Sequence, residues 1–425
     1  MRKNIVLFIN GVPKDAVDSL RKYSKQKKQP IRIAVLRNSK RRISKADQKR
    51  LKERADILLK ADFARPLQII KVLNPFQDHL LAMTARMGEE NVVDMAHLVP
   101  FVPYLRTPTK DSLLWSVDKL MMRKRFRAYD KKITPSFTVV SDMKKGTLEK
   151  IKERVGFPLI LKPADLTASL LVNICFHEDE LKSTLSKTLR KIKQAYKEHK
   201  RKTEPKILVE QFMEGEMYSI DGYVNSRGSL YWCPMVHVKT GKAIGFDDFF
   251  GYQQMTPTSL KKESIRHAEA AATKAVHALA LRSSTVHVEL IRTEHGWKVI
   301  ELGPRLGGFR NEMYRQSYGI DHGLNDILIR IPELPRVRRS IKGYSAVMKI
   351  FAKKEGKLTQ LKGVRRIKKL KSVVGVNVNK KIGDICKFAK HGGKSVVNVH
   401  LFHKTKAGLL ADIRRVEQTL VISTG

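Results

Sequence analysis

The chain has 425 residues, 42% of them hydrophobic, which is enough for two to four domains with sizeable cores and excludes a disordered chain. Lysine and arginine number 84 against 41 acidic residues, so the formal net charge is +43. No apolar run approaches the roughly 18 residues of a membrane-spanning helix. The three cysteines form no CxxC pair, which argues against a zinc site or a disulfide framework.

Residues 1–110 alternate strand and helix patterns, as is typical of a parallel sheet covered by helices. The first apolar run, 4–9, is shorter than the apolar core of a signal peptide, so we expect a first strand and a cytoplasmic protein. No GxGxxG follows it, which argues against a nicotinamide site. Further strands are expected at 31–36 and 57–59, and helices at 15–23 and 75–87.

Prolines between residues 100 and 108 mark a linker, after which the pattern changes. We predict a domain over 111–335, built of two lobes at about 111–205 and 206–335, and a small C-terminal α+β domain over 336–425. Over these two domains together, helices are expected at 111–130, 181–201, 263–281 and 406–418. Strands are expected in the same two domains at 137–140, 159–162, 207–211, 218–224, 230–238, 286–291, 297–302, 346–352, 373–378, 395–402 and 420–422.

The strongest local signal is the hairpin formed by strands 286–291 and 297–302. Glu289 and Glu301 each interrupt an apolar strand, and their separation places them opposite each other across the turn. Two facing carboxylates repel unless a cation lies between them. Magnesium favours one or two carboxylates together with nucleotide phosphates, so the hairpin predicts a metal site.

The segment after the hairpin extends this site. Arg305 follows the second strand, where it can hold a transferring phosphoryl group. Gly307 and Gly308 allow the backbone to approach a ligand closely. The plain alternative is a surface hairpin with unrelated acidic residues, but that leaves the Arg-Leu-Gly-Gly run without a purpose.

Four further segments, in the same order along the chain, resemble the motifs of the ATP-grasp superfamily. They are the helix around 117–121, the strand at 156–164, the strand pair at 207–222 and the stretch from 255 to the hairpin. The resemblance covers roughly residues 112–335. It implies an ATP-grasp fold, ATP and Mg²⁺ as cofactors with Mn²⁺ as an alternative ion, and ADP-forming ligase activity. The loop at 165–172 departs from the family in having no glycine, and Gly303 stands where an asparagine is common.

The resemblance also implies roles for individual residues. Lys119 and Lys162 would hold ATP phosphates, and Ser169 would contact them from the loop. Glu210, with the backbone near Phe212, would read the adenine edge, and Glu216 would hold the ribose. The residues implied to bind ATP are Lys119, Lys162, Ser169, Glu210, Gln211, Phe212, Met213 and Glu216; those implied for metal are Glu289 and Glu301, and those for catalysis are Glu301 and Arg305.

The segment from residue 343 onward resembles the C-terminal domain of ligases related to biotin carboxylase, a subgroup that includes amino-acid ligases and carnosine-synthase-like enzymes. We therefore expect a carboxylate–amine ligase that forms an amide through an acyl phosphate on amino acids or similar small molecules. The alternatives are a ligase that uses bicarbonate or modifies a protein or polymer, and a non-catalytic nucleotide or polyanion binder.

Basic residues gather in patches that attract phosphates and nucleic acid. These patches are 37–54, 182–206, 336–342 and 365–371. Nonspecific nucleic-acid or polyanion binding is one interpretation, and a proteome-wide lysine bias or a salty cytoplasm is the other. We expect no membrane partner, and a homodimer is a candidate assembly.

Overall fold

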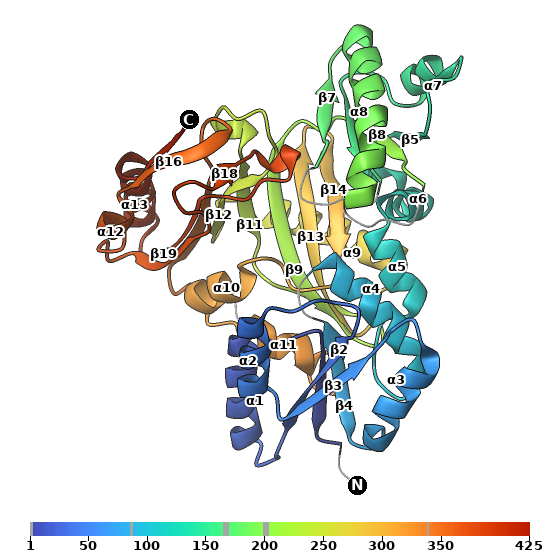
Figure 1. Cartoon of the computed structure of the whole chain (residues 1–425), viewed down its shortest axis with the longest axis vertical. Helices are drawn as coiled ribbons and strands as arrows, with labels where there is room; N and C mark the ends of the chain where they lie inside the picture. Colours follow the sequence, from blue (N-terminus) through green and yellow to red (C-terminus); the bar gives the residue numbers. More distant parts are fainter. Residues whose placement is uncertain (1–2, 86–87, 165–169, 199–203, 338–339) are drawn as a thin grey trace.

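The computed structural model describes residues 3–85, 88–164, 170–198, 204–337 and 340–425 (Figure 1). It is a mixed α/β structure with a parallel sheet at the N-terminal end and antiparallel sheets in the rest of the described chain. None of the helices described is long and apolar enough to cross a bilayer.

The N-terminal sheet has the order β3-β2-β1-β4, and all its strands are parallel, as predicted. Both faces of β1 are covered, which explains its uninterrupted apolar sequence. The strands are β1 (Ile5–Ile9), β2 (Arg32–Asn38), β3 (Ile57–Ala61) and β4 (Leu80–Ala85). The helices are α1 (Lys14–Gln26), α2 (Lys45–Arg54), α3 (Pro66–Leu73) and α4 (Glu89–Leu98).

The helix predicted over 75–87 is wrong, because this segment contains strand β4. A strand buried on both faces reads as a continuous apolar run, and such a run cannot be distinguished from a buried helix by its periodicity. The single helix predicted over 111–130 is also divided. Asp118 has an extended backbone between α5 (Lys110–Val117) and α6 (Lys119–Tyr129), and its carboxylate accepts from the amides of Leu120 and Met121.

A small antiparallel sheet, ordered β5-β8-β6-β7, carries two of the predicted ATP motifs. Its outer helix α8 (Glu178–Glu198) packs an apolar stripe on the sheet and turns its lysines to solvent. The strands are β5 (Phe137–Val140), β6 (Leu159–Pro163), β7 (Asn173–Cys175) and β8 (Ile207–Gln211), and the other helix is α7 (Thr147–Arg154).

The largest sheet has nine strands, in the order β14-β13-β9-β11-β12-β15-β19-β17 with β10 beside β9. The strand predicted at 230–238 is two strands, because Pro234 cannot donate to a ladder. The strands are β9 (Glu216–Val224), β10 (Leu230–Trp232), β11 (Val236–Thr240), β12 (Gly251–Thr256), β13 (Ser284–Thr293), β14 (Gly296–Gly303), β15 (Tyr344–Ile350), β17 (Val373–Val378) and β19 (Val397–His403).

This sheet continues across residue 335, since β12 pairs with β15. The C-terminal segment therefore extends the sheet of the preceding lobe (Figure 1). It also adds a three-stranded sheet, β18-β16-β20, and two helices. These elements are β16 (Gly356–Lys362), β18 (Ile385–Cys386), β20 (Val421–Thr424), α12 (Val364–Ile367) and α13 (Lys406–Thr419).

The two faces of the large sheet have different roles. One face packs against α6 and α9 (Lys262–Ala278) through alternate apolar residues of β9 and β13. The other face packs against α10 (Arg310–Tyr318) and carries polar side chains. Helix α11 (His322–Leu328) then packs on the N-terminal sheet and joins that domain to the rest.

Candidate functional site

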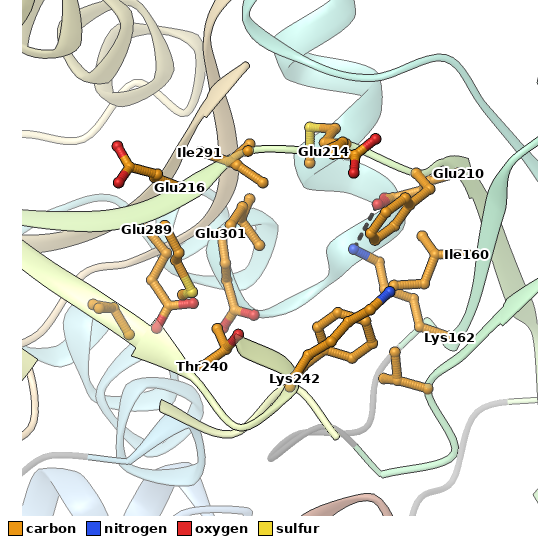
Figure 2. Close-up of a pocket in the computed structure, with 18 of the residues that line it drawn as sticks. Ile160, Lys162, Glu210, Glu214, Glu216, Thr240, Lys242, Glu289, Ile291 and Glu301 are labelled. Carbon is orange, nitrogen blue, oxygen red and sulfur yellow. Dashed lines mark ion pairs between the residues drawn. The ribbon is translucent and has the colours of Figure 1, made fainter. Parts of the chain in front are cut away.

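Two adjoining cavities lie where the small sheet, the large sheet and the C-terminal segment meet. The first has a volume of about 590 Å³ and lies between the two sheets (Figure 2). The second has about 840 Å³ and lies between the α10 face of the large sheet and the C-terminal strands. Glu289 and Glu301 line both cavities, so a ligand in one can reach a ligand in the other at this carboxylate pair.

The predicted facing of these two carboxylates is confirmed, because Glu289 on β13 is the direct partner of Glu301 on β14. Figure 2 shows both side chains directed into the first cavity. Lys119 at the start of α6 lies close by, with Nζ 3.8 Å from Oε2 of Glu301. The described residues contain no cluster of three or more metal-ligating side chains. A site of two carboxylates still fits Mg²⁺, which completes its shell with phosphate oxygens and water.

His287 connects Glu289 to a buried charge. Its Nε2 lies 3.5 Å from Oε1 of Glu289, and its Nδ1 lies 2.7 Å from Oδ1 of Asp221. Burial would lower the pKa of His287, but Asp221 raises it above its usual value. Burial would raise the pKa of Glu289, but the hydrogen bond and charge of His287, aided by Arg305 and Arg310, lower it. These neighbours therefore favour the ionised form of Glu289, the form in which a carboxylate binds a cation.

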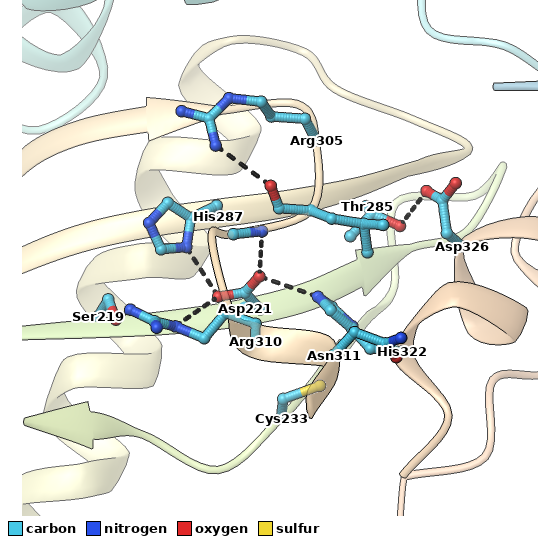
Figure 3. A network of polar contacts seen from close by, with 12 residues as sticks. Ser219, Asp221, Cys233, Thr285, His287, Arg305, Arg310, Asn311, His322 and Asp326 are labelled. Atoms are coloured by element: carbon cyan, nitrogen blue, oxygen red, sulfur yellow. Dashed lines mark hydrogen bonds and ion pairs between the residues drawn. The ribbon is translucent and has the colours of Figure 1, made fainter. Parts of the chain in front are cut away.

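Asp221 is the centre of a network that holds the segment after the hairpin (Figure 3). Its Oδ2 accepts from the backbone amide of Gly307 at 2.8 Å and lies 2.9 Å from Nε2 of His322. Burial would raise the pKa of Asp221, but His287 and His322 hold it well below the usual range. The chain that carries Arg305 is thus fixed to the sheet by a buried carboxylate.

A second charged cluster joins the two lobes beside the first cavity. Arg123 on α6 and Lys162 on β6 both bind the carboxylate of Glu210, at 2.6 Å and 2.7 Å. Arg123 also donates to the carbonyls of Val299 and Ile300 on β14. Burial, with the nearby charges of Arg123 and Lys119, lowers the pKa of Lys162 to about 8 despite the pull of Glu210. Near this pH, part of the Lys162 population is the neutral amine, whose protonation a nearby anion would favour.

Most of the residues singled out from the sequence converge on these cavities. Arg305 lines the second cavity with Glu289 and Glu301. Ser169 lies outside the described residues. The remainder line the first cavity: Lys119, Lys162, Glu210, Gln211, Phe212, Met213, Glu216, Glu289 and Glu301.

Two details of the structure bear on the expected reading of adenine. The carboxylate of Glu210 is engaged by Arg123 and Lys162, so its side chain already has partners before a nucleotide is present. The backbone amide of Phe212 donates to the carbonyl of Pro158 at 2.9 Å. The reading of adenine by Glu210 and the backbone near Phe212 stays a prediction.

Sequence reasoning missed several residues of the site. Lys242 lines the first cavity, where its ammonium lies 4.8 Å from the ring centre of Phe212 and 5.7 Å from that of Phe249. Arg123 belongs to a helix with several basic residues, so its sequence position does not distinguish it from the exposed ones. The one available signal was its apolar neighbourhood, since Met122 and Phe126 lie on the buried face of α6.

Comparison with known proteins agrees with this geometry. The chain contains a segment, residues 155–312, that matches the family model described as the ATP-grasp domain. It is 24% identical over 233 residues to the uncharacterized protein y4rH of Sinorhizobium fredii, and the match covers 54% of this chain and 45% of that protein. The chain thus matches less than half the length of this relative.

Solved structures share the whole fold at low identity. The L-amino acid ligase from Bacillus licheniformis aligns with a TM-score of 0.77 and 16% identity, over 100% of this chain and 99% of that chain. The biotin carboxylase domain of 2-oxoglutarate carboxylase from Hydrogenobacter thermophilus, in complex with MgADP, ADP and bicarbonate, aligns with a TM-score of 0.65 and 14% identity. That alignment covers 98% of this chain and 90% of that chain. Both show the ATP-grasp fold.

Proposed function

We propose that the protein is an ADP-forming ligase that joins a carboxylate to an amine through an acyl phosphate. One observation supports this most: Glu289 and Glu301 face each other at the junction of two cavities, with Lys119 and Lys162 on one side and Arg305 on the other. A nucleotide binder without catalysis has no need of a second cavity at the terminal phosphate. The structural likeness to an L-amino acid ligase favours amino acids as substrates.

ATP would occupy the first cavity. Lys119 and Lys162 would bind its phosphates, and the segment 210–213 with Glu216 would contact adenine and ribose. Glu289 and Glu301 would hold Mg²⁺, which neutralises phosphate charge and orients the triphosphate when bound. Phosphate oxygens also give Lys162 the anionic partner that favours its charged form.

The reaction would take place between the cavities. An oxygen of the substrate carboxylate attacks the γ-phosphorus, and the bond from that phosphorus to the bridging oxygen breaks to release ADP. Arg305 stabilises the charge that develops on the transferred group. The amine nitrogen then attacks the acyl carbon and loses a proton, and phosphate leaves with one oxygen of the original carboxylate. The network around Asp221 keeps Arg305 in position throughout.

The test is a screen of carboxylate and amine pairs, beginning with pairs of L-amino acids, for phosphate release in the presence of ATP and Mg²⁺. We expect release that requires both substrates and an amide product of matching mass. Phosphate release that is unchanged by any carboxylate or amine would contradict the proposal.

A further inference from the structure

The second cavity contains a lysine whose ammonium is not paired with any carboxylate of the described residues. Lys349 lies on β15 and lines this cavity. Within the described chain its ammonium makes no hydrogen bond or ion pair, and it lies 5.6 Å from the ring centre of Phe309. Burial lowers the pKa of Lys349, and Arg310 adds to this effect, while Glu289 opposes it. A partly buried cation without a counter-ion is costly unless a ligand supplies one.

An amide donor stands directly beside this lysine. Asn398 on β19 is the register partner of Lys349, so the two side chains project from the same face of the sheet about 5 Å apart at Cβ. The hydroxyl of Ser395 donates to Oδ1 of Asn398 at 2.7 Å, which orients the amide. No hydrogen bond of its Nδ2 is found among the described residues. The pair therefore offers an ammonium and an N–H to the same cavity.

The neighbouring guanidinium is already occupied. Arg310 donates to Gln254 at 2.5 Å, to Ser219 at 2.7 Å and to the carbonyl of Gly308 at 3.1 Å. The guanidinium of Arg310 therefore serves to hold the α10 face together. Of the other cations that line the cavity, Arg305 follows the hairpin and Lys394 is exposed, so Lys349 is the partly buried ammonium for which no hydrogen bond or ion pair is found among the described residues.

The chemistry of the Lys349–Asn398 pair indicates the group that it would bind. One ammonium and one amide match a carboxylate, which has two oxygens and a single charge. The same cavity is lined by charges of both signs: the carboxylates Glu89, Glu90, Glu289 and Glu301, two of which would hold Mg²⁺, and the cations Arg305, Arg310, Lys349 and Lys394. This mixture favours a ligand that carries an amine as well as a carboxylate. A zwitterion with separated charges fits such a cavity.

We propose that Lys349 and Asn398 bind the free carboxylate of an amino acid that serves as the amine substrate. This inference rests on the proposed function for the role of the amine, but the binding itself requires no turnover. The carboxylate held here stays unreacted, while the amino group is left to attack the acyl phosphate near Glu301. The pair thus determines specificity for amino acids over simple amines and amino-acid amides.

The test compares binding of the twenty proteinogenic L-amino acids with that of their α-amides, by thermal shift and then by calorimetry. The wild type should bind at least one amino acid about tenfold or more tighter than its amide, since a charge-assisted contact is lost in the amide. Lys349→Met keeps the packing on Phe309 without the charge, and should reduce that amino acid's affinity to the level of the amide. Lys349→Arg should restore most of the difference.

Asn398→Ala should lower the preference less than Lys349→Met does, because it removes one neutral donor. Lys353→Met is the matched control, since this exposed lysine lies outside both cavities and should leave the preference unchanged. Binding of no amino acid, or an equal loss for acid and amide in Lys349→Met, would overturn the inference. Failure of ATP turnover with preserved discrimination would count against the ligase proposal alone.

Discussion

At the scale of single residues, the site contains charged side chains whose burial is unfavourable and is offset by neighbouring opposite charges. Arg123, Lys162 and Glu210 form a buried cluster in which each charge needs the others. Removing one partner of such a cluster typically costs several kcal/mol, because the remaining charge stays buried. The cluster thus holds the two lobes together. Because Arg123 and Lys162 share one carboxylate, the cluster has an excess positive charge, which the triphosphate would balance.

The metal assignment makes a prediction for Glu301. Glu301→Gln should reduce substrate-dependent ADP formation about 100-fold or more, because a single carboxylate cannot hold the ion on the phosphates. Its melting temperature should stay near that of the wild type, since Glu301 is partly exposed to the cavity. Glu294→Gln, at the exposed turn of the same hairpin, is the control and should retain activity. Near wild-type turnover in Glu301→Gln at ordinary magnesium would refute the assignment.

The lowered pKa of Lys162 predicts that ATP binding is coupled to the uptake of a proton. Its pKa of about 8 should rise when phosphates are bound, so the protein should take up a proton from solution near pH 8. ATP affinity should accordingly fall as the pH rises above about 8. Calorimetry in buffers of different ionisation enthalpy measures this uptake. Lys162→Met should abolish the uptake, and adenosine should show none with the wild type; the same uptake in Lys162→Met would be inconsistent with this role.

At the scale of elements, the strand alternation was the most informative feature of the sequence. The period of two in β13 and β14 was sufficient to place Glu289 opposite Glu301. It failed for β4, where burial of both faces removes the alternation. It also could not reveal that His287, Asp221 and His322 meet, because these residues come from two strands and a helix whose packing is set by tertiary contacts.

Lys349 and Asn398 were missed for the same reason. They are paired across two strands of the C-terminal segment, and the sequence gives no sign that this pair faces the hairpin. The two conspicuous glycines were recognised, but their different environments depend on tertiary structure. A Cβ on Gly307 would lie 2.8 Å from Oδ2 of Asp221 and 2.5 Å from Nδ1 of His287, whereas one on Gly308 meets nothing within 4 Å.

These two glycines provide a matched pair of variants. Gly307→Ala should destabilise the protein by about 1–3 kcal/mol, because the methyl group would clash with Asp221 and His287. It should also lower turnover by displacing Arg305. Gly308→Ala should change stability by less than about 0.5 kcal/mol, since the space is open. Denaturant unfolding of both variants tests this; equal stabilities would mean that the Asp221 network does not fix this segment.

At the scale of the whole molecule, the net charge of +43 is not explained by the site. The basic helix α8 keeps its lysines on the solvent side, so part of the charge belongs to an ordinary exposed face. A field of this size attracts polyanions at low salt whether or not they have a function. Salt dependence distinguishes the two cases, because exposed charges are screened beyond about 8 Å at physiological ionic strength.

We predict that nucleic acid binds nonspecifically at low salt and is released by about 0.15 M salt. Binding releases counterions from the nucleic acid, and added salt opposes this release. A filter-binding salt titration with RNA, together with ADP formation measured with and without RNA, checks this. Binding that persists at that salt, or a changed rate, would instead make a polyanion a functional partner.

The central claim is the acyl phosphate, and transfer of oxygen from the carboxylate to phosphate tests it most directly. A carboxylate substrate labelled with ¹⁸O at both oxygens should give phosphate that contains one ¹⁸O and an amide that retains the other, as read by mass spectrometry. The label should appear only when ATP and the amine are both present, and Glu301→Gln should suppress it. Amide formed with unlabelled phosphate, or with AMP and diphosphate as the products, would contradict the account.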